Sequence, residues 1–311
     1  MCDEIKKLLE QKSFDEILRK YGLYKYELIS GIRNELYKNP GMPNEGSSLN
    51  PDEQAILMNI YLEHASMFNI ENEKVMLVSD THMKSRVERL DYFRYVLDYC
   101  EDQGIRYLIH GGDIADGTYI KDGKSYSISF DTTETIVKDQ VDYILSNYPT
   151  SSKVKQYVLS GNHDERYTYP KSGVDILKIL AQYKGIYPLG PLQAFGHING
   201  QLISLEHRGY NCPALAAAQV NRPDFTIRGH SHKNDFSLLN TIYLPALSDN
   251  DNNDKNDVYH KKMGINILPG FTVMEPIETE YATIFKCQSF YFDNIGHQEN
   301  DEKKFTLKKK I

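Results

Sequence analysis

Residues 161–164 read Gly-Asn-His-Asp and directly follow the apolar run 157–159. The glycine permits a sharp backbone turn and a close approach to a ligand. The amide of Asn162, the imidazole of His163 and the carboxylate of Asp164 could then bind a metal ion or transfer a proton. A loop with helix-capping residues is the alternative, and the tetrapeptide alone does not decide between them.

Four further clusters share this layout, in which a short apolar run ends in side chains that bind metals. In chain order they are Asp80 and His82 after Val78, Asp113 after Ile109, His207 after Leu205, and His230 with His232 after Ile227. Sites in layered α/β domains lie at the carboxyl ends of strands, so these side chains are candidates for one site. Carboxylate oxygens mixed with imidazoles suit Mn, Fe or Zn better than Ca or Cu.

The candidate ligands are numerous enough for two metal ions if one carboxylate is shared. Two ions about 3.5 to 4 Å apart can clamp a phosphate and lower the pKa of a bridging water. Such a pair supplies hydroxide for in-line attack near neutral pH. The pattern therefore indicates hydrolysis of a phosphoester.

The motifs Asp-x-His, Gly-Asp-x-x-Asp, Gly-Asn-His-Asp, a lone His and Gly-His-x-His, in that order, resemble the signature of the calcineurin-like metallophosphoesterases. They occupy residues 80–82, 112–116, 161–164, 207 and 229–232. The resemblance extends from about residue 74 to at least residue 247. It implies an α/β fold, a two-sheet metallophosphoesterase sandwich flanked by helices, with both metals at one end of the sheets.

The same resemblance implies a role for each matched residue. One ion would be held by Asp80, His82, Asp113 and His232, and the other by Asn162, His207 and His230 with Asp113 shared. His163 would act near the leaving group as general acid or oxyanion stabiliser, oriented by Asp164. Asp116 would support the ligands without binding metal. We expect two divalent ions, with manganese ahead of iron or zinc.

One position departs from the family pattern, because Glu206 stands before His207 where the family often has glycine. Arg166 and Arg208 lie close to motifs and could pair with a substrate phosphate, although surface ion pairs are an equal alternative. We expect the remaining candidates to be ordinary hydrogen-bonded histidines, namely His110, His197, His260 and His297.

Apolar runs alternate with amphipathic stretches from residue 74 onward, which is typical of a layered α/β domain. The pattern predicts strands over 75–78, 106–109, 157–159, 202–205, 225–227 and 242–244. It predicts helices over 87–101, 132–147, 174–183 and 213–220. The polar stretch 117–131 follows a motif and is either a lid over the site or a solvated hairpin.

A small helical domain is predicted before this region. Ser13 and Glu16 are placed as a capping box, and Gly22 is placed to end the first helix. Residues 14–33 resemble the helix-turn-helix of DNA-binding proteins, so DNA is a candidate partner through residues 13–38. A helical hairpin used for packing or oligomerisation is the alternative, since basic and acidic charges nearly cancel there.

Residues 39–50 are rich in Pro, Gly and Ser and predict a linker. The expected divisions are a helical domain with its linker over 1–50, a metallophosphoesterase domain over 51–297 and a charged, frayed tail over 298–311. A helix over 51–68 is expected to pack on the second domain.

The 311 residues carry a formal net charge of -7. This charge argues against a protein that binds nucleic acid non-specifically through its overall electrostatics. The four cysteines form no close pair, so neither a zinc knuckle nor a disulfide framework is indicated. No leader or membrane span is recognised. A cytoplasmic protein without a membrane partner is expected.

The sequence thus predicts a metal-dependent phosphoesterase, a hydrolase acting on ester bonds. Because Asp164 completes its motif where protein phosphatases of the superfamily usually have Glu, a phosphodiesterase or nuclease-like enzyme is favoured. Nucleic acids and nucleotides are candidate substrates. The alternatives are a phosphomonoesterase or protein phosphatase, and a non-catalytic DNA-binding or scaffolding protein that retains its metals.

Overall fold

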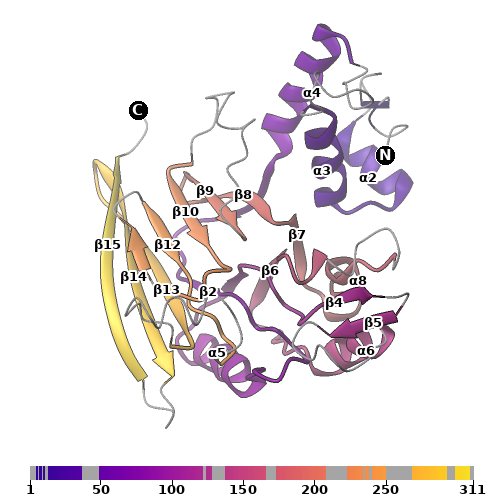
Figure 1. Ribbon diagram of the computed structural model, residues 1–311. Helices are drawn as coiled ribbons and strands as arrows, with labels where there is room; N and C mark the ends of the chain where they lie inside the picture. The colour runs from indigo at the N-terminus through magenta and orange to yellow at the C-terminus, as the bar shows by residue number, and fades with distance from the viewer. Residues whose placement is uncertain are drawn as a thin grey trace.

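The computed structural model describes residues 5, 7–8, 10, 13–36, 49–121, 124–127, 137–165, 173–207, 223–233, 235–237, 240–249, 268–292 and 298–308. Two β-sheets pack against each other, and helices cover the other side of one sheet (Figure 1). Further helices form a unit with its own hydrophobic cluster near the N-terminus. The predicted two-sheet α/β sandwich flanked by helices is confirmed.

The seven-stranded sheet leads to the first three motifs. Its order is β15 (Gln298–Lys308), β14 (Ala282–Phe292), β13 (Gly270–Glu278), β2 (Val75–Val78), β3 (Tyr107–His110), β6 (Lys155–Ser160) and β7 (Tyr187–Pro191). Val75 and Leu77 pack toward the second sheet, whereas Met76 and Val78 pack toward the helices. Because both faces are covered, β2 is apolar at every position.

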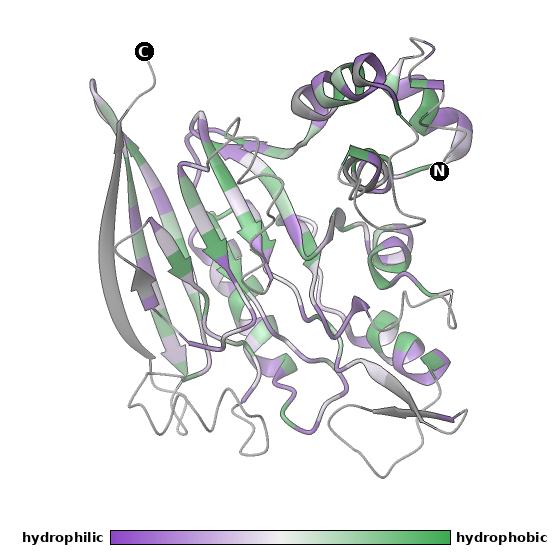
Figure 2. Cartoon of the chain, turned by 45° about the horizontal axis from the view of Figure 1, so that its top comes forward, coloured by the Kyte–Doolittle hydropathy of each residue, from purple (hydrophilic) through white to green (hydrophobic). Residues whose placement is uncertain are grey.

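The six-stranded sheet carries the remaining two motifs. Its order is β1 (Ser66–Ile70), β8 (Gln193–Ile198), β9 (Gln201–Glu206), β10 (Phe225–Arg228), β12 (Thr241–Tyr243) and β11 (Asp235–Ser237). Leu205, Ile227 and Ile242 reach the core between the sheets. The residues that follow each of them point to the opposite face. Hydrophobic residues accordingly recur along the strands of both sheets (Figure 2).

Three helices cover the seven-stranded sheet, namely α5 (Leu90–Asp102), α6 (Val137–Asn147) and α8 (Ile176–Lys184). Their buried residues include Phe93, Ile144 and Leu180. The carboxylate of Asp175 caps α8 by accepting from the backbone N–H of Lys178. The ends of α5 and α8 match the predicted helices to within three residues. The end of α6 matches the helix predicted over 132–147, whose first residues lie outside the described part of the chain.

The N-terminal unit contains α2 (Phe14–Tyr21), α3 (Lys25–Leu36) and α4 (Pro51–His64). Leu57 and Tyr61 of α4 share a hydrophobic cluster with Leu28 and Ile32 of α3. The prediction that this helix packs on the second domain is therefore wrong. The helix also ends at residue 64, because residues 66–70 pair with β8 as strand β1.

The ends of these helices differ from the sequence prediction in one respect. Gly22 adopts a left-handed conformation and ends α2, as predicted. Ser13 precedes α2 but makes no side-chain capping bond. The capping box is instead formed at α4, where Asn50 and Glu53 satisfy each other's backbone N–H groups.

The first turn of α3 contacts the two-sheet sandwich. The hydroxyl of Tyr26 donates to Asp175 Oδ2 at 2.5 Å, and Glu27 Oε1 lies 3.1 Å from Lys178 Nζ. Lys25 Nζ donates to the carbonyl oxygen of Ser66 at 2.7 Å. The N-terminal turn of α3 is thus bound to the sandwich by hydrogen bonds and an ion pair.

The predicted tail contains a strand. Residues 298–308 form β15, which pairs antiparallel with β14 along its whole length, so the expectation of a frayed tail is wrong. The residue types did not indicate this strand, because charged residues are common in edge strands as well as in tails. The sheet therefore extends beyond the predicted domain limit at residue 297.

Part of the polar stretch after the second motif forms a hairpin, with β4 (Thr118–Lys121) paired to β5 (Lys124–Ser127). Several predictions lie outside the described residues, namely most of the linker, the helix over 213–220, Arg166, Arg208, His260 and His297. Within the described residues, no helix is long and apolar enough to cross a membrane.

Candidate metal centre

The predicted site residues follow the carboxyl ends of five strands from the two sheets. Asp80 and His82 follow β2, Asp113 follows β3, Asn162 and His163 follow β6, His207 follows β9, and His230 and His232 follow β10. The loops are joined by hydrogen bonds, since Asp80 N–H donates to the oxygen of Gly112 at 2.9 Å and His82 N–H donates to the oxygen of Asp113 at 3.1 Å. The structure brings all five motifs together.

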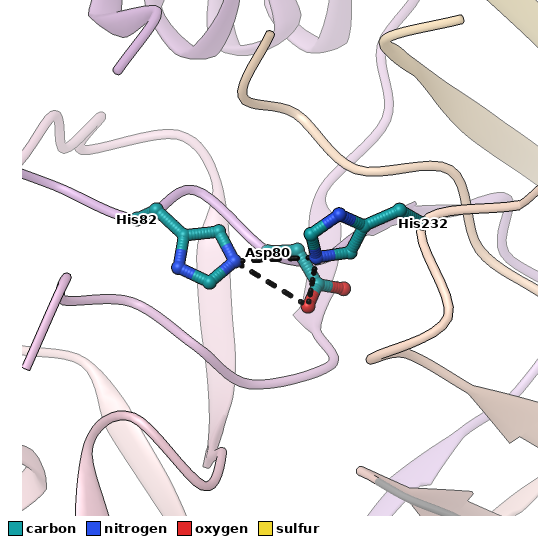
Figure 3. A group of neighbouring side chains, drawn as sticks. All are labelled: Asp80, His82 and His232. Atoms are coloured by element: carbon teal, nitrogen blue, oxygen red, sulfur yellow. Dashed lines mark hydrogen bonds and ion pairs between the residues drawn. The ribbon is translucent and has the colours of Figure 1, made fainter. Parts of the chain in front are cut away.

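One ligand cluster contains Asp80, His82 and His232, whose ligand atoms lie within 4.8 Å of one another. Nε2 of His232 is 3.3 Å from Asp80 Oδ1, and Nε2 of His82 is 3.8 Å from the same oxygen. The two imidazoles converge on the carboxylate from different loops (Figure 3). Their ring nitrogens are 3.3 Å apart, which suits two ligands of one cation.

A second cluster contains Asp113, His207 and His230. Nε2 of His207 lies 3.0 Å from Asp113 Oδ2, while Nδ1 of the same ring donates to the oxygen of Gly111 at 2.8 Å. That bond fixes the ring so that Nε2 faces the carboxylate. Asp113 Oδ2 also lies 4.0 Å from Nε2 of His82 in the first cluster, so Asp113 stands between the two.

Unpartnered polar atoms test whether these residues fit a metal. Among the described residues, the buried atoms that make no hydrogen bond include Asp80 Oδ1, Asn162 Oδ1 and His207 Nε2. Asp80 Oδ1 and His207 Nε2 do lie near an opposite charge, at 3.3 Å from His232 Nε2 and 3.0 Å from Asp113 Oδ2, but without the geometry of a hydrogen bond. A buried polar atom left unsatisfied costs about 1 to 3 kcal/mol. All three are predicted ligand atoms, and carboxylate oxygen, amide oxygen and imidazole nitrogen all coordinate divalent cations. The residues present therefore fit a metal centre.

Burial and charge act against each other at this centre. Burial disfavours the ionised carboxylate of Asp80, but His232 and His207 outweigh it and keep the pKa of Asp80 below its usual value. Burial likewise opposes the charged form of His207, yet Asp113 and Asp80 raise its pKa to about 9. A proton and a metal ion are therefore alternatives on Nε2 of His207.

His82 behaves differently from His207 although both rings are buried. Burial lowers the pKa of His82 to about 3, and the neighbouring His163 contributes to the shift. The imidazole of His82 is thus neutral near pH 7, which is the form that binds metals.

The backbone holds the ligands in an unusual conformation. Asp80, His82, Asp113, His230 and His232 all have positive φ, between 43° and 72°. Side chains other than glycine rarely adopt this region, and such strain clusters at functional sites. These residues are held in place by the bonds between loops, including donation from His230 N–H to Asp80 Oδ2 at 3.0 Å.

His163 stands at the edge of the two clusters with 19% of its side chain exposed. Nδ1 of the ring lies 2.6 Å from the backbone oxygen of Asp116, and Nε2 lies 3.9 Å from Asp113 Oδ2. Because a carbonyl oxygen can only accept, Nδ1 carries the hydrogen and Nε2 faces the site. Nε2 is therefore the atom that could transfer a proton.

Asp164 does not orient His163 by a hydrogen bond, contrary to our expectation. Its carboxylate instead accepts from the backbone N–H groups of Gly161, Ile114 and Ala115 at 2.8 to 3.0 Å. Burial and the nearby charge of Asp113 raise the pKa of Asp164 to about 7. Asp164 thus ties the loop after β6 to the loop that carries Asp113.

The sequence analysis missed one contributor, His110, which it treated as an ordinary histidine. His110 is fully buried at the end of β3, where Nδ1 accepts from Gly112 N–H at 3.2 Å and Nε2 lies 3.2 Å from Thr81 Oγ1. The ring therefore braces two metal-site loops. Its position directly before a ligand motif was the available signal.

A profile described as calcineurin-like phosphoesterase matches residues 73–234, which is more than half of the chain and contains all the predicted ligands. The chain belongs to the calcineurin-like phosphoesterase family. The two-sheet sandwich and the convergence of the five motifs agree with that membership. No curated protein matches this chain.

Solved structures resemble this chain only loosely. A structure described as a novel archaeal phosphodiesterase is 13% identical, with 75% of this chain and 99% of that chain covered and a TM-score of 0.38. Vps29 from Chaetomium thermophilum is 12% identical, with 76% and 100% covered and a TM-score of 0.39. Likenesses this low give no information on substrate or catalysis.

Proposed function

We propose that this phosphoesterase is a dinuclear metal-dependent phosphohydrolase that cleaves a P–O bond, with phosphodiesters preferred over monoesters. The observation that carries the proposal is the approach of the Asp80–His82–His232 cluster to the Asp113–His207–His230 cluster. His82, Asp113 and the accessible ring of His163 form a third group that joins the two. Asp80, His82, Asp113 and His232 would hold one ion, and Asn162, His207 and His230 would hold the other with Asp113 shared.

Two bound divalent ions would neutralise phosphoryl charge and lower the pKa of a coordinated water. Manganese is the ion we propose, because the donor set mixes carboxylate, amide and imidazole. Oδ1 of Asp113 accepts from the backbone N–H of His163 at 2.8 Å and so holds the loop after β6. Oδ2 of Asp113 is left facing the imidazoles. One carboxylate thus positions both the candidate acid and the ligands.

His163 would donate a proton from Nε2 to the leaving oxygen. Its Nδ1–H bond to the carbonyl oxygen of Asp116 fixes the ring, so a proton on Nε2 is directed into the site. The diester preference rests on Asp164, as its motif resembles that of the phosphodiesterases in the family. Asp164 would contribute by fixing backbone geometry, since its carboxylate accepts from the backbone N–H groups of Ile114, Ala115 and Gly161.

The test is hydrolysis of an aryl phosphodiester and the matching monoester by the full chain, with and without added Mn²⁺. We expect Mn²⁺-dependent turnover with the diester preferred, and loss of turnover in His163→Ala. Faster hydrolysis of the monoester would overturn the diester preference. Absence of turnover despite two bound ions would favour a scaffolding protein that retains its metals.

DNA binding through residues 13–38 stays a prediction. The N-terminal residues of a recognition helix read base edges in helix-turn-helix proteins. Here Tyr26 and Glu27 in that part of α3 contact Asp175 and Lys178, so α3 would have to leave the sandwich to bind DNA. Retention of the full chain on DNA at increasing salt would test this, since phosphate contacts weaken steeply with salt.

A further inference from the structure

Three polar side chains form a ladder across neighbouring strands of the six-stranded sheet. Glu206 on β9 lies beside Arg228 on β10, and Arg228 lies beside Tyr243 on β12. Arg228 donates to Glu206 Oε2 from Nε at 3.1 Å and from a terminal nitrogen at 2.6 Å. Its other terminal nitrogen donates to the hydroxyl of Tyr243 at 3.2 Å.

The ladder includes a buried carboxylate, because Glu206 is only 7% exposed. Burying a carboxylate is costly unless it is paired and hydrogen-bonded. Both of its oxygens are satisfied, with Oε2 taken by Arg228 and Oε1 accepting from Ser204 Oγ at 3.0 Å. Breaking one member would leave a charge without its partner.

The place of the ladder connects it to the metal centre. Glu206 directly precedes His207, and Arg228 precedes His230 by two residues. The backbone pairing of β9 with β10 continues to the ends of both strands, since Gly229 N–H donates to the oxygen of Glu206 at 3.0 Å. The two histidine loops of the second cluster therefore leave the sheet from adjacent, cross-linked positions.

We propose that the Glu206–Arg228 pair is a positioning element that sets the spacing of His207 and His230 for the second metal ion. It also accounts for the departure from the family pattern, since a charged residue stands where the family often has glycine. This inference rests on the proposed dinuclear function. Glu206 and Arg228 hold the ligand loops and do not contact the ion.

The principal test measures Mn²⁺ bound per chain after equilibrium dialysis over a range of free Mn²⁺, for wild type and Glu206→Gln. Mutation of a residue that orients a metal ligand typically lowers the affinity for the metal by about 10- to 100-fold. We expect the affinity for one of the two ions to fall by that factor while the other ion is retained. Unchanged affinity for both ions would overturn the proposal.

Two further variants guard against a folding defect. Arg228→Lys keeps the charge but loses the two-pronged contact, so an intermediate shift is expected. Tyr243→Phe keeps the whole ion pair and should cost only a few-fold in affinity. If Glu206→Gln does not fold, unchanged Mn²⁺ binding by Arg228→Lys would reject the positioning role.

The matched control is Arg106→Gln, which breaks an ion pair with Glu73 at the opposite end of the seven-stranded sheet. This exposed pair should leave Mn²⁺ binding unchanged. An equal loss of affinity in this variant would show that the effect of Glu206→Gln is general destabilisation. Wild-type protein that binds fewer than two ions would instead reject the proposed function itself.

Discussion

The two sheets bring different chemistry to one site. Loops of the seven-stranded sheet supply both carboxylates, Asp80 and Asp113, together with the amide of Asn162 and the imidazole of His82. The described loops of the six-stranded sheet supply only imidazoles among the predicted ligands, namely His207, His230 and His232. An acidic half therefore meets a basic half, and each lowers the cost of burying the other.

This difference means that neither sheet holds a complete centre. The imidazoles outweigh the effect of burial on the pKa of Asp80, and the carboxylates outweigh the effect of burial on the pKa of His207. The ligand set is assembled only where the sheets pack together. Variants of either half should thus reveal what that half contributes.

Asp113→Asn should have the largest effect, because it removes the carboxylate that stands between the clusters. We expect loss of both ions and a fall in activity of about 10³-fold or more, since supporting residues alone are worth about 10- to 100-fold in metal affinity. Metal content and turnover should be measured together. Asp98→Asn on the exposed side of α5 is the control, and two retained ions would disprove the shared role.

His163→Ala should separate catalysis from metal binding within the same half. Both ions should remain, while turnover falls by about 10²-fold or more, as expected for a positioned acid. The comparison requires metal content and kcat on the same sample. Loss of an ion would make His163 a ligand, and unchanged turnover would remove it from the mechanism.

Gly229→Ala should force the two halves apart. A methyl group there would collide with Ser79 Oγ and lie 2.9 Å from the oxygen of Gly111, both on the opposite sheet's loops. We expect about a tenfold loss of Mn²⁺ affinity, similar to loss of a supporting contact. Adding Ser79→Ala should recover part of it, and failure to recover any would point to another cause.

His110→Gln should have the smallest effect, since it removes a brace behind the acidic half. Gln cannot contact both Gly112 N–H and Thr81 in the same geometry. We expect a loss of Mn²⁺ affinity at the lower end of the range for supporting residues, a few-fold to about tenfold. His197→Gln is the matched control, because that ring bonds Ser66 in β1. Equal effects would contradict a specific role for His110.

The candidate ligands could be located from sequence because each motif follows an apolar strand within a few residues. Asp80, Asn162 and His230 carry that local signal whatever surrounds them. Their assignment to one ion or the other came from family resemblance, and the structure supports it only by bringing the residues together. The positive φ values of the candidate ligands could not be predicted, because none of these residues is glycine.

Features that depend on distant partners were not predictable in the same way. The apolar residues of α4 predict that the helix packs against a hydrophobic surface, but they do not identify that surface. In the structure the surface belongs to α3. The charges along residues 298–308 are compatible with an exposed edge strand as well as with a tail. The support given by Glu206 exists only once β9 and β10 are paired.

The position of β13 has a consequence for biosynthesis. Strand β2, which leads to Asp80, has β3 on one side and β13 on the other, so one neighbour arrives early and the other far later in the chain. All predicted ligands will have left the ribosome before Thr272 can pair with Leu77. Non-local pairing of this kind slows folding and leaves a strand edge open to aggregation meanwhile. The nascent chain thus carries its ligands before it has closed the sheet that supports them.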